Sequence, residues 1–507
     1  MQQQKDFPAT QSQGSMSQGP VSQGPMSQGP MERTALRFAA VAERWFPDSF
    51  IFGVIAVAIV AIAALLNGAS PSDIGKSFGD GYWSLITFTF QMVFMVMASY
   101  VVAISPPVAR VIDWLSGIPK TGRGAVAFIA MMGMLVSLIG WALCLIFGAF
   151  LVRACARRKE LNMDIRAACA AGYLGLGATW ALGISSSAAL LQANAGSLPK
   201  NILAITGVIP LTETIFLWQS MVMCAIILAL SVIIAYLSAP SAANAVTAEH
   251  LGADISRASH EVAKPEKPSE WLEYSPLLTL VLVALGILWV VREFTSQWTA
   301  LGSAAQAAVT FISSLNTYNF VFIILGLLLH WRPRSFLNAV SKSMPAIGGI
   351  LVQYPLYGSI AMILTGAKNA AGVSVSDQLA HFFISTTTQS TFPVVVGIYS
   401  AFLGLFVPSG GGKWILEAPY VMHAANELKV HLGWMVQTYN AAEALPNLIN
   451  PLFMVPMLGI LGMKARDMVG FTFLQFVIHV PVVLFLLWFL AGTLTYAPPV
   501  IPPGVIP

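Results

Sequence analysis

The stretch F-V-P-S-G-G-G-K-W-I-L-E-A-P, from Phe406 to Pro419, is a polar, glycine-rich interruption between two apolar segments. Lipid cannot hydrogen-bond bare backbone, so non-helical chain at membrane depth persists only where it is buried in protein or lines a wet cavity. Pro408 ends the preceding helix, and the three glycines after Ser409 allow an unusual backbone path into the next one. The stretch therefore predicts a hairpin that carries a site.

The residues of this hairpin suit a small anion. Free N–H groups would stand at the start of a helix, whose positive end favours negative charge. They would come from Ser409, Gly410, Gly411 and Gly412. With the serine hydroxyl and Trp414 beside them, these amides fit a carboxylate that carries a short apolar tail. The alternative is a kinked, tightly packed hairpin in which glycine only allows close helix contact.

The composition is that of a membrane protein. Of 507 residues, 56% are hydrophobic and 9% are charged, and the mean hydropathy is +0.73. Repeated apolar runs can cross a bilayer as helices, and none shows the alternation of barrel strands. We expect an all-α polytopic membrane protein with about ten to twelve membrane segments. The small net charge of +4 and the position of basic residues beside apolar runs indicate membrane topology rather than nucleic-acid binding.

Metal and cofactor motifs are not found in the sequence. It contains no H-E-x-x-H, G-x-S-x-G or nucleotide-binding loop. The cysteines lack C-x-x-C spacing, so neither a disulfide framework nor a zinc site is expected. We expect no cofactor other than a coupling proton or sodium ion. The cysteines are Cys144, Cys155, Cys169 and Cys224.

The chain divides into two apolar halves joined by a polar linker. Repeats of the type S-Q-G-P-M predict a disordered N-terminal tail, and the basic, aromatic segment after it predicts an interfacial helix. The expected parts are the tail at 1–30, the interfacial helix at 31–48, the first membrane half at 49–237, the linker at 238–275, the second membrane half at 276–492 and a proline-rich tail at 493–507.

The apolar run from Gly124 to Val152 predicts a second hairpin. Arg123 precedes the run and Arg153 follows it. Because basic loops stay on the cytoplasmic side, both ends of the run are expected there, which a single span cannot achieve. We predict a turn at Ile139-Gly140-Trp141, and the alternative is one long tilted helix.

Each half also contains an interrupted apolar helix after its hairpin. Glycines precede Ser185, Ser186 and Ser187, which either line a polar cavity or bond back to carbonyls of their own helix. Asn447 and Asn450 stand in a proline-broken run of the second half. The two halves thus form a pseudo-repeat of re-entrant hairpins and broken helices, which is typical of carriers that bind substrate between two repeats near the midplane.

Two acids and a further proline add polar candidates. Pro355 is expected to break a helix and leave Gln353 and Tyr357 free to face a cavity. Glu417 and Glu443 lie in apolar sequence, where a charge is penalised by about 2.5 kcal/mol or more, so we expect them to face a cavity and to bind the coupling ion. The alternative is that they pair with Lys413 or lie nearer the interface.

Four motifs give the chain a family resemblance. They are W-F-P-D-S-F-I-F, G-D-G-Y-W-S, G-I-L-V-Q-Y-P-L-Y and V-P-S-G-G-G-K-W-I-L-E-A-P. From Arg33 to Leu490 the chain resembles the bacterial short-chain fatty acid transporter family, AtoE-type, of the ion transporter superfamily. The resemblance implies uptake of short monocarboxylates such as butyrate or acetoacetate across the inner membrane. It places Gln353 and the residues from Ser409 to Trp414 at the site.

We therefore expect a multi-pass protein of the bacterial inner membrane that acts as a secondary active transporter by alternating access, not as an enzyme. Its partners would be the carboxylate and the lipid bilayer, with homodimer formation left open. A monoanion entering an inside-negative cell works against about 2.3 kcal/mol per 100 mV, which favours symport with a cation. The alternatives are a passive anion channel and an intramembrane serine protease that uses Ser185 and His479.

Overall fold

The computed structural model describes residues 49–256, 266–268, 270–344, 347–405, 407 and 409–501. The predicted tail at 1–30 and the predicted interfacial helix at 31–48 lie outside these residues, as do Pro408 and parts of the linker and of the C-terminal tail. In the described residues the regular structure is helical, with one isolated bridge between Lys368 and Ser374.

Six helical segments of the described chain are long and apolar enough to cross a membrane. A seventh is added if the bent pair α15 (Ala304–Ser313) and α16 (Leu315–His330) is one span. The predicted all-α polytopic architecture is confirmed, and the number of membrane segments stays a prediction. The six segments are Pro71–Ala103, Ile165–Gln192, α11 (Trp218–Ser238), α14 (Pro276–Leu301), α18 (Gly348–Gly366) and α24 (Ala465–Ala491).

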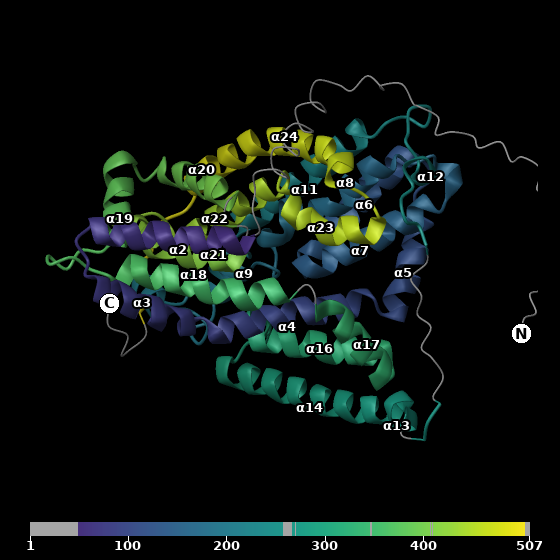
Figure 1. The fold of residues 1–507 in the computed structure, drawn as a ribbon, viewed down its shortest axis with the longest axis horizontal. Coiled ribbons are helices and arrows are strands. Elements are labelled where there is room, and N and C mark those ends of the chain that lie inside the picture. The colour runs from purple at the N-terminus through teal and green to yellow at the C-terminus, as the bar shows by residue number, and fades with distance from the viewer. Residues whose placement is uncertain are drawn as a thin grey trace, which may run out of the picture.

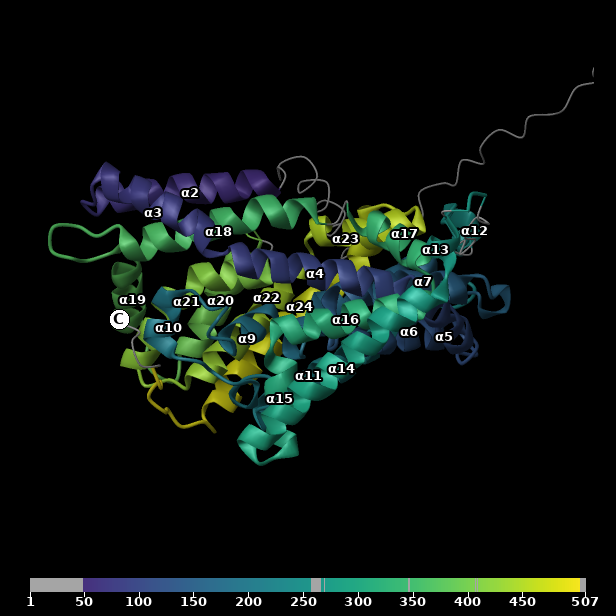
Figure 2. The same ribbon diagram turned by 90° about the horizontal axis from the view of Figure 1, so that it is seen from below.

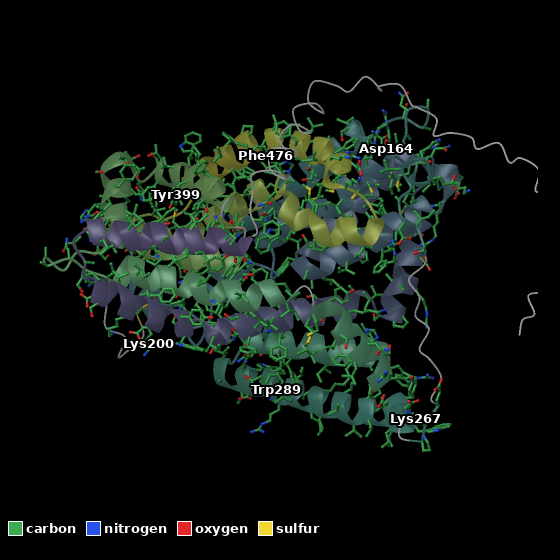
Figure 3. All side chains as sticks on the ribbon, in the orientation of Figure 1. Asp164, Lys200, Lys267, Trp289, Tyr399 and Phe476 are labelled. Carbon is green, nitrogen blue, oxygen red and sulfur yellow. The ribbon has the colours of Figure 1, made fainter. Side chains whose placement is uncertain are left out.

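The spans differ in how far they are enclosed. Figure 1 shows α14, α16 and α17 (Pro333–Ser343) as a layer at one edge of the molecule, with α14 outermost. Only 17% of the apolar window of α14 is buried, whereas 89% of the window within Ile165–Gln192 is buried. Trp289 lies on this outer helix (Figure 3) and is 39% exposed. The edge layer therefore suits contact with lipid, and the segment from Ile165 forms the interior.

The N-terminal helices pack against α18 of the second half. Helix α18 crosses α3 where Gly81 and Gly358 bring the two backbones together, since a Cβ on Gly81 would lie 2.5 Å from the Gly358 carbonyl oxygen. The prediction that Pro355 breaks a helix is wrong, because α18 continues through it. Pro355 has no N–H to donate within the helix, and the turn that follows it lies against α3 at Gly358. The helices here are α2 (Ser49–Leu66), α3 (Pro71–Ser84) and α4 (Ile86–Ala103).

The predicted first hairpin is confirmed. It consists of α6 (Gly122–Ser137) and α7 (Trp141–Ala156), and the break includes Gly140 as predicted. Gly133 and Gly148 lie on either side of the turn, and both face the carbonyl oxygen of Gly172. A Cβ added to Gly133 would lie 3.2 Å from that oxygen, and one added to Gly148 would lie 2.5 Å from it. The two helices therefore run back alongside each other.

The two ends of this hairpin also meet. Arg158, just after α7, donates to the carbonyl oxygens of Ser116 and Pro119, just before α6, at 2.7 and 2.8 Å. The basic loops that flank the apolar run are thus side by side, which excludes the alternative of one long tilted helix.

The interrupted helix of the first half is confirmed as well. Helix α8 (Ile165–Leu174) passes into a π-helical turn at Gly175–Thr179, a 3₁₀ turn at Trp180–Leu182, and α9 (Ser187–Gln192). Glycine lowers the cost of such departures, and π-turns are frequent at functional sites. The break carries Gly183 and the serines into the middle of the molecule.

The second hairpin is formed by α20 and α21, which lie side by side with α22 in both views (Figures 1 and 2). Their antiparallel course is fixed by paired contacts. The hydroxyls of Tyr399 and Tyr420 are 2.9 Å apart, and Ser400 Oγ donates to Glu417 at 3.2 Å. The hairpin predicted from the glycine-rich stretch is confirmed. The helices are α20 (Phe392–Gly404), α21 (Gly410–Glu427), α22 (Leu432–Asn447) and α23 (Pro451–Leu461).

The remaining helices are short. They connect the spans or lie at the ends of the molecule (Figure 2). They are α5 (Pro106–Ser116), η1 (Lys159–Leu161), α10 (Lys200–Thr206), η4 (Leu211–Glu213), α12 (Ala248–Leu251), α13 (Glu270–Tyr274) and α19 (Val375–Thr386).

Candidate functional site

The start of α21 is enclosed by aromatic rings. Ser409 is its N-cap, and its Oγ accepts a hydrogen bond from the Gly412 amide at 3.2 Å. A Cβ on any of the three glycines would lie less than 3.0 Å from ring atoms. The ring of Trp180 occupies that position at Gly410, Phe88 at Gly411 and Tyr357 at Gly412. The tight packing that the sequence left open is therefore present, and two of the three rings come from the first half.

Trp414 joins both halves one turn further along. Its side chain is fully buried, and its Nε1 donates to Gln192 Oε1 of α9 at 3.2 Å. Its ring lies against Tyr439 of α22, with 4.9 Å between ring centroids. Trp414 therefore holds the start of α21 between the two interrupted helices.

The serine triplet reaches α22 through one of its members. Ser186 is the N-cap of α9, and its Oγ donates to Asn440 Oδ1 at 3.0 Å. The Asn440 amide in turn donates to Gln437 Oε1 at 2.6 Å. The broken helix of the first half and the broken helix of the second are thus linked by side chains within the buried interior.

The other two serines flank this link. The Ser185 amide donates to the Leu138 carbonyl oxygen at 3.2 Å, at the tip of the first hairpin. Ser185 Oγ is buried and has no hydrogen-bond partner among the described residues. Ser187 Cβ is 3.2 Å from the position of a Cβ on Gly411. The structure therefore brings the predicted serines and the predicted glycines together.

Gln353 is connected to the same place through a tyrosine. It is half-buried on α18 and accepts a hydrogen bond from the Tyr357 hydroxyl at 3.3 Å. The ring of Tyr357 covers Gly412. Gln353 therefore belongs to the outer surroundings of the start of α21.

The two asparagines lie at the other end of α22. Asn447 Nδ2 donates to the Leu176 carbonyl oxygen at 3.3 Å, and the Tyr173 hydroxyl donates to the Asn447 carbonyl oxygen at 2.8 Å. Asn450 is buried just beyond the helix. In the described residues, the hydrogen bonds of Asn447 lead to the π-turn of the first half rather than to Ser409.

Lys413 forms a buried ionic cluster with both predicted acids. Its Nζ lies 3.0 Å from Glu417 Oε1 and 2.7 Å from Glu443 Oε2. It also donates to the carbonyl oxygen and to Oγ of Ser400, both at 2.7 Å. The ring of Tyr439 lies 4.6 Å from Nζ. The three charged side chains are 0%, 0% and 1% exposed, so solvent does not screen them.

Glu417 and Glu443 both pair with Lys413, which was one alternative for the acids, and their role in binding a coupling ion stays a prediction. The spacing of Lys413 and Glu417 by four residues is a sequence signal for this pairing. Glu443 reaches the same ammonium from another helix, which spacing cannot reveal. Two carboxylates and one ammonium leave an excess negative charge unless a proton is bound.

The serine protease alternative finds no support in the geometry. His479 Nε2 is 2.8 Å from Ser231 Oγ, and its Nδ1 is 2.7 Å from the Gln475 carbonyl oxygen. Both ring nitrogens are therefore used within α11 and α24. Ser185 has no hydrogen bond to a histidine among the described residues.

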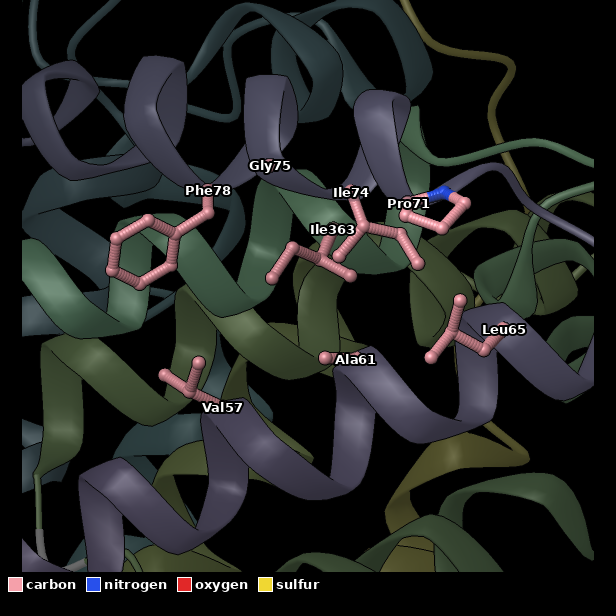
Figure 4. A pocket seen from close by; sticks show the side chains of 8 residues that line it. All are labelled: Val57, Ala61, Leu65, Pro71, Ile74, Gly75, Phe78 and Ile363. Atoms are coloured by element: carbon pink, nitrogen blue, oxygen red, sulfur yellow. The ribbon is translucent and has the colours of Figure 1, made fainter.

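An apolar groove of about 350 Å³ lies between α2 and α3 (Figure 4). Its lining contains no polar side chain, so it offers a carboxylate neither a donor nor a charge. The groove therefore differs from the start of α21, which has a serine hydroxyl and backbone amides. The lining residues are Val57, Ala61, Leu65, Pro71, Ile74, Gly75, Phe78 and Ile363.

The spanning helices, paired hairpins and broken helices define a polytopic helical membrane protein. The solved Alcanivorax borkumensis YdaH transporter, described as having an unusual topology, gives a TM-score of 0.57 at 16% identity, over 88% of this chain and 98% of that one. Neisseria gonorrhoeae MtrF, described with a class of antimetabolite efflux pumps, gives 0.53 at 13% identity, over 92% of this chain and 99% of that one. At these identities the likeness concerns the fold alone.

The sequence comparisons identify the family. A family model described as Short chain fatty acid transporter matches residues 30–490. An Escherichia coli (strain K12) protein, named provisionally as a short-chain fatty acid transporter, is 30% identical over 430 residues, which are 84% of this chain and 92% of that one. A protein of the same name from Haemophilus influenzae (strain ATCC 51907 / DSM 11121 / KW20 / Rd) is 27% identical over 454 residues. These residues are 88% of this chain and 97% of that one. The chain therefore belongs to the short-chain fatty acid transporter family.

Proposed function

We propose that this protein is a secondary active transporter that carries short monocarboxylates, such as butyrate or acetoacetate, across the bacterial inner membrane together with a cation. The observation that supports this most is the position of the start of α21. It lies between the broken helix of the first half and α22 of the second, where a carrier of two repeats binds its substrate. The family membership supports the class of substrate.

The carboxylate would bind at the helix start capped by Ser409. Backbone amides and the positive end of α21 favour an anion there. The rings that cover the glycines offer an apolar surface to a short tail, and Trp414 fixes the helix start against both halves. Because the rings close over the glycines in this structure, binding requires them to move apart, as alternating access demands.

Polar groups around the helix start would complete the site. Ser185, Ser186 and Ser187 lie beside it on the first half, and Gln353 lies beyond Tyr357. Asn447 and Asn450, at the far end of α22, would act on the movement of the broken helices rather than on the carboxylate. Glu417 of α21 and Glu443 of α22 would bind the coupling ion where they meet Lys413, one turn beyond the helix start.

The test is uptake and counterflow of labelled butyrate in proteoliposomes. We expect saturable uptake and counterflow in the wild type, which a passive channel does not give. Ser409→Ala and Gly411→Val should reduce uptake at least tenfold, because the first removes the cap and the second meets Phe88.

The control for these variants is Ser303→Ala. Ser303 caps α15 in the same way as Ser409 caps α21, but it lies outside the site. Its transport should match the wild type. Unchanged kinetics in both site variants, with normal membrane insertion, would refute the proposed site.

A further inference from the structure

The surroundings of the Lys413 ammonium resemble those of a bound metal cation. Four oxygen atoms lie within 3.0 Å of Nζ, and they belong to a backbone carbonyl, a hydroxyl and two carboxylates. These are the ligand types that hard cations take in proteins. The aromatic face of Tyr439 closes a further side, as cation–π contacts do. The Lys413 ammonium therefore occupies a position whose surrounding oxygens suit a bound cation.

We propose that the ion coupled to transport is a proton, and that Lys413 is a built-in cation that excludes sodium from this site. This inference rests on the proposed function, since it names the ion that accompanies the carboxylate. A sodium ion would have to displace a covalently tethered ammonium from oxygens that already surround it. A proton needs no such displacement, because it binds to a carboxylate oxygen that carries the excess charge.

The charges of the cluster set the number of protons at one. With Lys413, Glu417 and Glu443 all ionised, the cluster carries a net charge of −1 in a fully buried place. An uncompensated charge in such surroundings is strongly disfavoured. One proton, taken from water on one side of the membrane, forms an O–H bond on a carboxylate and makes the cluster neutral. Breaking that bond returns the proton to water on the other side.

Glu443 is the better acceptor of this proton. Glu417 Oε1 accepts hydrogen bonds from Ser400 Oγ in addition to its ion pair with Lys413, which stabilises its ionised form. Glu443 has only its ion pair with Lys413 among the described residues. Among the described residues, the other titratable groups near the cluster are phenols on α18, α20, α21 and α22. They are Tyr354, Tyr357, Tyr399, Tyr420 and Tyr439.

The carboxylate site and the cluster are adjacent on one helix. The Lys413 amide donates to the Ser409 carbonyl oxygen at 2.8 Å, so one helical turn separates them. An anion at the helix start makes a deprotonated cluster less favourable, and a protonated cluster makes the anion more favourable. Such coupling is reciprocal by thermodynamic necessity. Substrate and proton are therefore expected to bind together.

The first experiment compares driving forces in proteoliposomes that contain the wild type. A pH gradient, acid outside, should drive more accumulation of labelled butyrate than in protein-free liposomes, into which butyric acid diffuses unaided, and an imposed sodium gradient without a pH gradient should not. Accumulation that follows sodium and ignores the pH gradient would overturn the inference. Counterflow without any gradient tests the proposed function separately, because it requires carriage of butyrate but no coupling ion.

The second experiment removes the excess charge. Glu443→Gln leaves one ammonium and one carboxylate, a neutral pair that needs no proton. We expect accumulation under the pH gradient to fall to the level of protein-free liposomes, while butyrate still exchanges through the variant at a reduced rate. The control is Glu273→Gln, the same change in a half-exposed residue paired with Arg334. Accumulation as in the wild type by both Glu443→Gln and Glu417→Gln would overturn the inference.

A third measurement does not depend on transport. Purified wild type in detergent should show no stabilisation by sodium chloride beyond that of choline chloride, because Lys413 fills the cation position. Lys413→Ala leaves the four oxygens without their cation and should gain a sodium-specific rise in Tm, as expected for a ligand that binds the folded state. A sodium-specific rise in the wild type and none in Lys413→Ala would contradict the proposal.

Discussion

The two hairpins share a geometry and differ in chemistry. In both, two helices run back alongside each other, with Gly140 in the break of the first hairpin and Gly410 at the start of α21 in the second. The first hairpin buries a neutral hydroxyl pair, in which Ser137 Oγ and Thr179 Oγ1 are 2.9 Å apart. The second buries Lys413 with two carboxylates. The two hairpins are thus similar supports, and the second one encloses an ionic cluster near its break.

The hairpins also pack by different means. In the first, Gly133 and Gly148 let two helices approach the backbone at Gly172. In the second, aromatic side chains fill the spaces left by the glycines of α21. Two backbones in direct contact can separate only if the helices themselves move apart. Aromatic side chains can instead rotate while the helices stay in place. The first hairpin therefore has the tighter backbone packing, and the second is the one that the proposed function requires to open.

The largest difference is expected when one buried polar partner is removed from each hairpin. Lys413→Leu leaves two buried carboxylates without a cation, which should cost about 3 to 5 kcal/mol of stability. Ser137→Ala removes a neutral hydrogen bond and should cost about 1 kcal/mol. Thermal unfolding in detergent measures both. Acid pH should restore part of the loss in Lys413→Leu alone, because its carboxylates become neutral.

Equal destabilisation of the two variants would contradict this contrast. It would mean that the cluster of the second hairpin is open to water or already neutral, and that charge does not distinguish the hairpins. A loss in Lys413→Leu that does not change with pH would have the same meaning.

A smaller effect is expected from the glycine packing of the first hairpin. A Cβ on Gly148 would lie 2.5 Å from the Gly172 carbonyl oxygen, and backbone cannot move aside as a side chain can. Gly148→Ala should therefore cost about 1 to 3 kcal/mol, the usual cost of overpacking. The matched control is Gly459→Ala in α23, where no atom lies within 4 Å of the new methyl group. A similar Tm for both variants would show that the first hairpin is not tightly packed.

Much of this comparison could be predicted from the sequence. Ser409 and its glycines, and Gly140 before Trp141, are local signals that interrupt apolar runs, and both hairpins occur where those signals stand. Pro355 carries the same kind of local signal, yet α18 continues through it. The helix lies against α3 beside this proline, and local residue spacing does not reveal such contacts between distant segments.

The site itself was only partly accessible from the sequence, for the same reason. The residue types of Ser186 and Gly411 mark them as candidates. The sequence around them does not reveal that Ser186 bonds to Asn440 or that Gly411 lies against Phe88. These partners come from helices far along the chain. The acid at 417 could be paired with Lys413 by its spacing, whereas the acid at 443 is joined to it only by the fold.

The smallest effect is expected at the ion pair that ends the first hairpin. Arg153 binds Asp254 and the Ile460 carbonyl oxygen, so it ties α7 to the linker and to α23. The Arg153 side chain is 9% exposed, but that of Asp254 is 46% exposed, which makes this pair the surface counterpart of the buried cluster at Lys413. Water and salt screen such a pair, so Asp254→Asn should cost only about 0.2 to 1 kcal/mol.

The pH dependence of this pair sharpens the contrast with the buried cluster. Hydrogen bonds from Ser256, and then the charge of Arg153, hold the pKa of Asp254 below its usual value. A depressed pKa means that the carboxylate stabilises the folded state above its unfolded pKa and that this contribution is lost as the pH falls through the folded pKa. The wild type should therefore lose its small advantage over Asp254→Asn in acid, whereas Lys413→Leu should gain stability there. Thermal unfolding of the three proteins across the acid range would show the two opposite slopes, and parallel slopes would mean that burial does not separate the two ion pairs.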